Sequence, residues 1–251
     1  MSRPHTTEAS GVVAVGGRNV YGVPVGMLML RSRFPRIVGD AGNAETWPFP
    51  VLYRIVEGTA PAKIVRRLDV QEMLPAFTEA ALELERAGVQ LVSTNCGFLV
   101  LMQQELQNRL SVPLLSSSLL QVPWVAATLP PSRTVAVLTV ERAALTDAHL
   151  RAAGIPPDLP LVVRGLDEFG GYFTEQILGD ELELDVDRCR HEHELAATSI
   201  LEDHPEVGAV VLECTNMPPY ADAIRRVTNL PVFDLTTLLG WGAAAVRQRQ
   251  V

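Results

Sequence analysis

Predominantly apolar runs alternate with helical patterns along most of this chain. The apolar runs are Val23 to Leu30, Val89 to Val92, Thr134 to Val140 and Val207 to Leu212. Between them, apolar residues recur at helical spacing, as in Gln71 to Ala87, which stops at Gly88, a residue typical of a helix C-terminus. Strands without alternating polar residues are typical of parallel sheets covered on both faces. The alternation of strands and helices therefore predicts an α/β fold with right-handed crossovers.

One strand–turn–helix unit occurs twice, and each copy carries a cysteine at the same place. The first copy runs from Gly88 through Cys96 to Pro113, and the second from Glu206 through Cys214 to Pro231, a constant offset of 118 residues. Such internal similarity indicates a duplicated supersecondary unit. Because ligands of open parallel sheets bind beyond the C-terminal strand ends, both cysteines fall at the expected ligand edge. We predict two pseudo-symmetric parallel-sheet lobes, with helices on both faces and the active-site cleft between them.

The same pattern suggests domain boundaries. We expect a first lobe at 20–118 plus 235–251, a second lobe at 119–234, and a loose leader rich in Gly, Ser and Thr at 1–19. The segment 31–50 is much longer than an ordinary connection of about 4–6 residues. It contains Phe34, Trp47 and Phe49, and aromatic residues are scarce in disordered segments. We expect this loop to fold over a pocket.

Composition narrows the classes of partner. The 251 residues are 47% hydrophobic, enough to build a proper core, and 29 acidic against 21 basic side chains give a net charge of -8. No basic cluster favours nucleic-acid binding, and no apolar run or signal sequence favours a membrane. Three cysteines without a close pair indicate free thiols in a reducing compartment, so we expect a cytoplasmic protein. The oligomeric state stays open, a homo-oligomer included.

The two repeated cysteines are the candidate reactive groups. Each falls where a strand ends and a helix is expected to begin, and a helix N-terminus favours a thiolate and binds carboxylates. A buried cysteine often serves merely as a small hydrophobe. Here, however, Thr94 and Asn95 precede Cys96, and Thr215 and Asn216 follow Cys214. The polar neighbours in both copies favour catalytic roles for the two thiols.

Other chemistries find less support in the sequence. Neither cysteine has the Cys-x-x-Cys or His-x-x-x-His spacing of a zinc site. His191 and His193 follow Cys189 closely, but two residues apart on a helix they point to different faces. No glycine-rich nucleotide motif is present. We expect no metal and no nucleotide cofactor.

The cysteine motifs resemble those of the aspartate/glutamate racemase superfamily, and the likeness extends roughly from Val23 to the C-terminal helix. The segment Glu213-Cys214-Thr215-Asn216 is similar to the Cys-Thr-Asn form of the isomerase and decarboxylase branches. The segment Thr94-Asn95-Cys96-Gly97-Phe98 differs from the Cys-Asn-Thr of glutamate racemases, since the amide precedes the thiol. The family includes glutamate, aspartate and hydantoin racemases, maleate isomerase and arylmalonate decarboxylase.

This resemblance implies a reaction that needs no pyridoxal phosphate, metal or other cofactor. One of Cys96 and Cys214, as a thiolate, would remove a proton beside a carboxylate, and the other would return a proton from the opposite face. The implied substrate-binding residues are Asn95, Gly97, Phe98, Thr215 and Asn216, with Thr139 at a family position that often faces substrate. We add Asn43, whose amide can donate to a carboxylate. Turn chemistry explains Asn43 about equally well, and an ordinary strand end explains Thr139 nearly as well.

The leading functional hypothesis is therefore a cofactor-independent racemase or epimerase of a small amino acid or related carboxylic acid. It would work by two-cysteine proton transfer at a single carbon. One alternative is a cysteine-dependent cis-trans isomerase or decarboxylase of a dicarboxylate. Another is a non-catalytic protein that binds a small acid.

Overall fold

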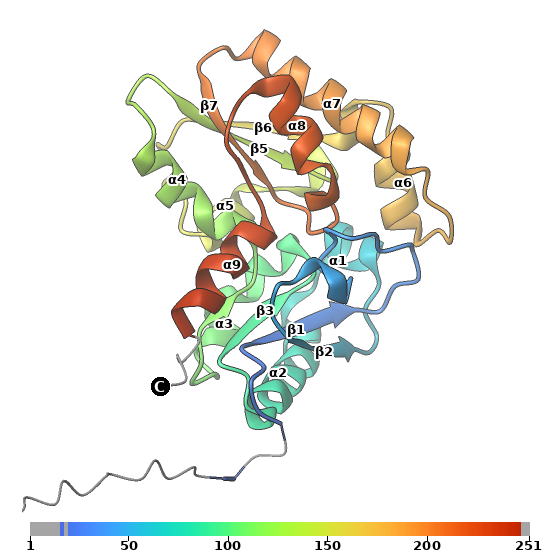
Figure 1. The fold of residues 1–251 in the computed structure, drawn as a ribbon, viewed down its shortest axis with the longest axis vertical. Helices are drawn as coiled ribbons and strands as arrows, with labels where there is room; N and C mark the ends of the chain where they lie inside the picture. The colour runs from blue at the N-terminus through green and yellow to red at the C-terminus, as the bar shows by residue number, and fades with distance from the viewer. Residues whose placement is uncertain (1–15, 18–19, 247–251) are drawn as a thin grey trace, which may run out of the picture.

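The computed structural model describes residues 16–17 and 20–246. The expected leader at 1–19 lies outside the described residues except for 16–17. Within the described part, two four-stranded sheets are the centres of two lobes, one above the other in Figure 1.

Each sheet is parallel throughout, and the two sheets repeat one strand order. The first sheet has the order β2-β1-β3-β4 and the second β6-β5-β7-β8. The strands of the first are β1 (Val25–Leu30), β2 (Val51–Val56), β3 (Leu91–Thr94) and β4 (Leu114–Leu115); those of the second are β5 (Thr134–Thr139), β6 (Leu161–Gly165), β7 (Val207–Leu212) and β8 (Val232–Phe233). β1, β3 and β5 are buried at every position, as expected for strands covered on both faces.

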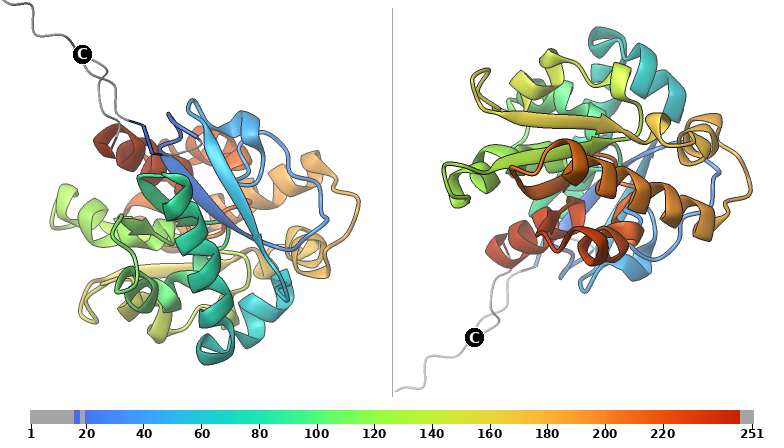
Figure 2. Two further views of the ribbon diagram at one scale, coloured as in Figure 1. Left: turned by 90° about the horizontal axis from the view of Figure 1, so that it is seen from below. Right: turned by 90° about the horizontal axis from the view of Figure 1, so that it is seen from above.

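Helices flank both sheets, as the views along the long axis show (Figure 2). They are α1 (Pro61–Arg67), α2 (Val70–Ala87), α3 (Gln103–Gln107), α4 (Val122–Thr128), α5 (Asp147–Ala152), α6 (Tyr172–Gly179), α7 (Val186–Asp203), α8 (Ala221–Thr228) and α9 (Leu235–Val246). The prediction of a two-lobed α/β fold with parallel sheets is confirmed.

The long helix α2 shows how the sequence sets its own limits. The Asp69 side chain accepts hydrogen bonds from the backbone N–H groups of Gln71 and Glu72, which caps the first turn. Gly88 ends the helix at φ 100°, a left-handed conformation that glycine adopts without steric cost. The buried face holds Met73, Leu74, Phe77, Ala80, Ala81 and Leu84, which pack on the first sheet and its turns.

The last helix returns to the first lobe. α9 follows β8 of the second sheet, yet it contacts β3 and β4 of the first. Leu235, Leu238, Leu239 and Ala243 form one buried cluster with Val25, Met27, Met29 and Leu91. α9 therefore covers one face of the first sheet, while α2 packs on strands of the same sheet from its own side.

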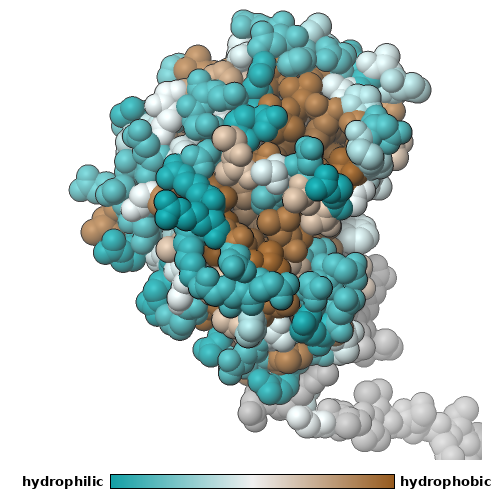
Figure 3. All heavy atoms as spheres, turned by 180° about the vertical axis from the view of Figure 1, so that it is seen from behind, coloured by the Kyte–Doolittle hydropathy of each residue, from teal (hydrophilic) through white to brown (hydrophobic). Residues whose placement is uncertain are grey.

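The surface is polar over most of its area. From behind, apolar atoms gather near the middle of the face, where the two lobes meet, and polar atoms border them (Figure 3). Among the described residues, no helix has the length and apolar character needed to span a bilayer.

Candidate functional site

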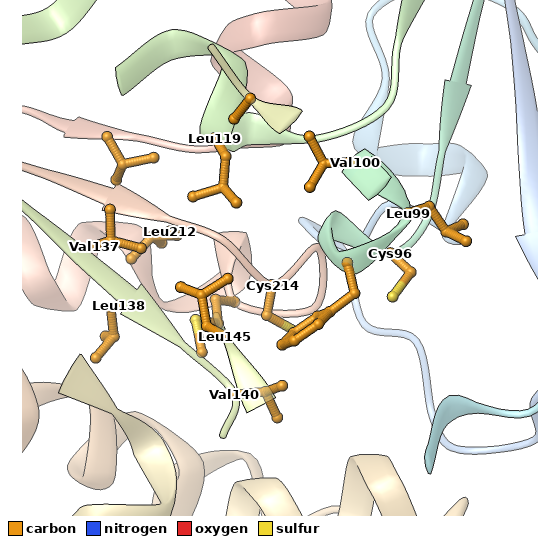
Figure 4. Packing of buried hydrophobic residues seen from close by; sticks show 14 of the residues in the cluster. Cys96, Leu99, Val100, Leu119, Val137, Leu138, Val140, Leu145, Leu212 and Cys214 are labelled. Atoms are coloured by element: carbon orange, nitrogen blue, oxygen red, sulfur yellow. The ribbon is translucent and has the colours of Figure 1, made fainter. Parts of the chain in front are cut away.

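The two repeated cysteines lie at the C-terminal ends of equivalent strands. Cys96 follows β3 and precedes the 3₁₀ turn Gly97–Met102, and Cys214 follows β7. Figure 4 shows Cys96 reaching the buried cluster from the first lobe, with Cys214 and Val140 coming from the second. Both cysteines line a single cavity between the lobes.

This cavity is small and mostly apolar. Its volume is about 20 Å³, room for about one water molecule. The apolar lining consists of Leu30, Phe34, Pro61, Val65, Phe98, Val140, Ile177 and Leu178, and the polar lining of Arg36, Asn95, Glu213, Thr215 and Asn216. A substrate with several heavy atoms needs more space, so the walls must part before it can enter.

The long loop and the end of α6 close the cavity from one side. Phe34 belongs to the loop, and its backbone N–H donates to Asp180 Oδ1 over 3.2 Å, while Arg33 pairs with the same carboxylate at 3.3 Å. Asp180 follows α6 at φ 55°. Since loop and helix belong to different lobes, these contacts hold the lobes together at the cavity mouth.

A hydrogen-bonded chain connects this loop with Cys214. Arg36 donates to Asp40 Oδ1 over 2.7 Å, and Asp40 Oδ2 accepts from the Asn216 amide over 2.6 Å. Asn216 Oδ1 in turn accepts from the Cys214 thiol, with an S···O distance of 3.4 Å. Arg36 and Asp40 are both largely buried, so the chain fixes the orientation of Asn216 beside the sulfur.

The Thr215 side chain joins the two cysteine turns. Its hydroxyl donates to the carbonyl oxygen of Asn95 in the other lobe. The Asn95 side chain bonds within its own lobe, where Oδ1 accepts from the backbone N–H of Leu30 over 2.7 Å. Both residues line the cavity, but these polar atoms are already engaged in hydrogen bonds within the protein.

Glu213 is a buried carboxyl group next to both cysteine turns. Its side chain is fully buried, and Oε2 accepts from the Thr139 hydroxyl over 2.8 Å. Oε1 has no hydrogen-bond partner. The carboxyl lies against the Cα of Gly97, where a side chain would overlap it. Glu213 therefore directly precedes Cys214 in the sequence and contacts Gly97, the residue that follows Cys96.

Burial controls the ionisation of these groups. It raises the pKa of Cys96 to about 12, with the nearby Glu213 charge adding to the rise. The pKa of Cys214 is also raised, by burial first and by Glu213 second. The pKa of Glu213 rises to about 8 because burial disfavours its charged form.

The expectation of thiolates stabilised by a helix N-terminus is wrong for this closed state. Backbone N–H groups of Phe98 and Leu99 do lower the pKa of Cys96, but burial outweighs them. The turn after the cysteine is a short 3₁₀ segment, so the favourable field is weak.

The predicted site residues divide into two groups. The cavity lining includes Cys96 and Cys214 together with Asn95, Gly97, Phe98, Thr215 and Asn216. The structure does not bring Asn43 or Thr139 to the cavity wall. Asn43 caps the short 3₁₀ turn Ala44–Thr46 and donates to the carbonyl of Arg36, because a short amide beside a turn bonds its own backbone first.

The sequence alone did not lead us to predict a role for Glu213, although this residue directly precedes Cys214 in the motif. One feature of the sequence could have indicated it: a carboxylate at the end of a buried strand, where an ionised group is costly. Cys189 is fully buried in α7. In the part of the chain that the structure describes, no group of three or more His, Cys, Asp or Glu residues could hold a metal ion.

Comparison by sequence relates this chain to lyases. No family model matches it. A dimethylsulfoniopropionate lyase of Durusdinium sp. clade D is 27% identical over 222 residues, which cover 86% of this chain and 72% of that protein. Dimethylsulfoniopropionate lyase 3 of Emiliania huxleyi (strain CCMP1516) is 27% identical over 85% of this chain. This chain spans 57% of the length of that second relative.

Comparison by structure relates the same chain to racemases and a decarboxylase. A variant of arylmalonate decarboxylase matches with a TM-score of 0.60 and 12% identity, over 88% of this chain and 92% of that one. Picrophilus torridus aspartate racemase matches with a TM-score of 0.55 and 17% identity, over 90% and 93%. Allantoin racemase from Pseudomonas fluorescens matches with a TM-score of 0.53 and 16% identity, over 89% and 91%.

Proposed function

We propose that this chain, which has the fold of the aspartate/glutamate racemase superfamily and is similar in sequence to enzymes, removes a proton from the carbon beside a carboxylate. A cysteine thiolate is the base, and a leaving group departs from the next carbon. The observation that carries this proposal is the convergence of Cys96 and Cys214, from opposite lobes, on one buried cavity.

Elimination is favoured over racemisation by the sequence relatives, which match over most of this chain and are named dimethylsulfoniopropionate lyases. With that substrate, the C–H bond beside the carboxylate breaks and its electron pair forms a carbon–carbon double bond. The C–S bond breaks, dimethyl sulfide leaves with the bonding electrons, and acrylate remains. The proton stays on the cysteine until solvent takes it.

The cavity suits such a reaction in two respects. Arg36, whose guanidinium also pairs with Asp40, lines it and presents N–H donors to a carboxylate. The apolar wall contributed by Phe34, Val140 and Leu178 excludes water. Exclusion of water strengthens every charge interaction with the carbanion-like transition state.

Racemisation is the second candidate, because two thiols facing one cavity can address opposite faces of a carbon. It requires both cysteines, whereas elimination requires a single base. The two reactions therefore predict different products and different responses to substitution.

The purified chain should be incubated with dimethylsulfoniopropionate, and dimethyl sulfide and acrylate measured by gas and liquid chromatography. We expect release of both products. Of the variants Cys96→Ser and Cys214→Ser, the one that changes the base should lose at least about 100-fold in turnover. Cys189→Ala, outside the cavity, serves as the control and should retain turnover.

A panel of chiral amino and dicarboxylic acids in heavy water tests the alternatives. Deuterium incorporation with inversion, lost in both Cys96→Ser and Cys214→Ser, would replace elimination by racemisation. Carbon dioxide release or cis-trans conversion would indicate the decarboxylase or isomerase branch. Absence of any turnover, together with a thermal shift caused by an acid, would leave a binding protein.

A further inference from the structure

The Glu213 carboxyl occupies a position between the two cysteine turns that its hydrogen bonds do not account for. The carboxyl interacts with the Thr139 hydroxyl and with the backbone N–H of Val140, but Oε1 is buried without a hydrogen-bond partner. Leaving a buried polar atom unpaired costs free energy. The carboxyl also lies against Gly97, directly after Cys96. A residue needed only for packing would be cheaper as an apolar side chain.

Few charges are available to compensate an ionised Glu213. The titratable and charged groups facing this region are Cys214 on its own segment, Cys96 on the opposite turn, and Asp40 and Arg36 on the long loop. Arg36 is the one cation in this set, and it is already paired with Asp40 at 2.7 Å. A second negative charge beside Glu213 would therefore meet like charge in a dry environment.

We propose that Glu213 is a positioning residue whose protonation permits either cysteine to become a thiolate, so that Glu213, Cys96 and Cys214 together hold at most one negative charge. The inference rests on the proposed function only in that the thiolate is the base of that reaction. An ionised Glu213 reaches the active form by taking the proton that a thiol loses. The S–H bond breaks, an O–H bond forms, and the net charge of the site is unchanged.

Ionisation of the neighbouring groups agrees with this arrangement. The pKa of Glu213 is raised to about 8 by burial, so the carboxyl is largely neutral at pH 7. The Glu213 charge is the second cause, after burial, of the raised pKa values of both Cys96 and Cys214. When Glu213 loses its proton at alkaline pH, both thiols become harder to ionise.

The test measures thiolate formation without any substrate. The alkylation rate of each cysteine by iodoacetamide is followed across neutral and alkaline pH by peptide mass spectrometry, and the midpoint of each rate–pH curve is compared between variants. Glu213→Gln keeps the shape and removes the charge. We expect the midpoints of Cys96 and Cys214 to fall by about one pH unit, a tenfold rise in rate at a fixed pH between the Glu213 pKa of about 8 and the midpoint.

A matched control is available in the second lobe. Glu192 is also a buried carboxylate, but it accepts from the backbone N–H groups of Tyr172 and Phe173 and lies near Cys189. Glu192→Gln should leave the midpoints of Cys96 and Cys214 unchanged.

A second variant keeps the carboxyl in place. Thr139→Val removes the side-chain hydrogen bond that favours the ionised form of Glu213, so Glu213 should stay protonated to higher pH. The midpoints of both thiols should then move in the same direction as in Glu213→Gln, by a smaller amount. This variant decides the matter if Glu213→Gln fails to give a native circular dichroism spectrum.

Unchanged midpoints in whichever of these variants folds would overturn the proposal. The outcome is separable from the proposed function. A chain that shows the shift but releases no dimethyl sulfide would refute elimination and retain the role of Glu213. A chain that releases dimethyl sulfide but shows no shift would support elimination and refute the role of Glu213.

Discussion

Gly97 is the position where a single methyl group should disturb both cysteine turns. A Cβ on Gly97 would lie 2.9 Å from Glu213 Cδ and closer still to Oε1 and to the Glu213 carbonyl oxygen. The carbonyl belongs to the backbone and Oε1 is packed in place, so neither can rotate away freely. The φ of Gly97 is not positive, and the conflict is therefore one of space alone.

The expected cost of Gly97→Ala is about 1–3 kcal/mol, as for other insertions into a well-packed interior. For a chain of this length each kcal/mol lowers Tm by about 2–4 °C. The thermal midpoint should therefore fall by roughly 2–12 °C. Relief of the overlap also displaces Cys96 or Glu213, and an error of about 1 Å in a catalytic group can cost about 100-fold in rate.

Gly240→Ala is the matched control for this substitution. Gly240 lies within α9, and a Cβ there would meet nothing within 4 Å. The same chemical change should stabilise the protein by about 0.5–1 kcal/mol, since alanine loses less backbone entropy in a helix. Urea unfolding of both variants, with turnover of dimethylsulfoniopropionate, checks the pair. A Gly97→Ala protein as stable and as active as the wild type would refute the close approach.

Three further predictions address the mouth of the cavity, the last helix and a buried histidine. Asp180→Ala removes the hydrogen-bond acceptor for Arg33 and Phe34, so Cys96 and Cys214 should be alkylated several-fold faster. The alkylation rate should change less in Asp180→Asn. The free energy of unfolding of Asp180→Ala should fall by at most about 1 kcal/mol. Leu239 is a fully buried residue of α9 that packs against the first sheet. Leu239→Ala should lower the free energy of unfolding, measured in urea, by about 2–5 kcal/mol. Burial lowers the pKa of His193 to about 4, so its neutral form contributes stability that is present above the unfolded pKa of 6.5 and is lost as pH falls toward 4. The free energy of unfolding should drop by about 2 kcal/mol more between pH 7 and pH 5 in the wild type than in His193→Phe; equal drops would contradict this.

Much of the architecture follows from local sequence, because the strands that lie centrally are mostly apolar. β1, β5 and β7 were predictable as apolar runs. β2 and β6 lie at sheet edges and are only partly buried, so their mixed composition gave no clear signal. Residues 142–153 form a 3₁₀ turn followed by α5 (Asp147–Ala152), with Thr146 as its N-cap, rather than one continuous helix.

The parts of the candidate site that occur in both sequence repeats could be predicted. The parts that depend on contacts between the two lobes could not. The shared offset located Cys96 and Cys214, and the structure places them on one cavity. No local pattern could show that Asn43 would cap its own turn, or that Glu213 would touch Gly97. Ionisation was the hardest to foresee, since the effect of burial on a thiol depends on how completely the two lobes close.

The return of α9 to the first sheet has a consequence for biosynthesis. The amino-terminal lobe is translated early, but the helix that shields Val25, Met27 and Met29 leaves the ribosome only after the entire carboxy-terminal lobe. During that interval one side of the nascent sheet has no cover from its own helix, and such exposed apolar surface invites aggregation. Maturation of the early half is thereby tied to synthesis of the segment that follows the second lobe.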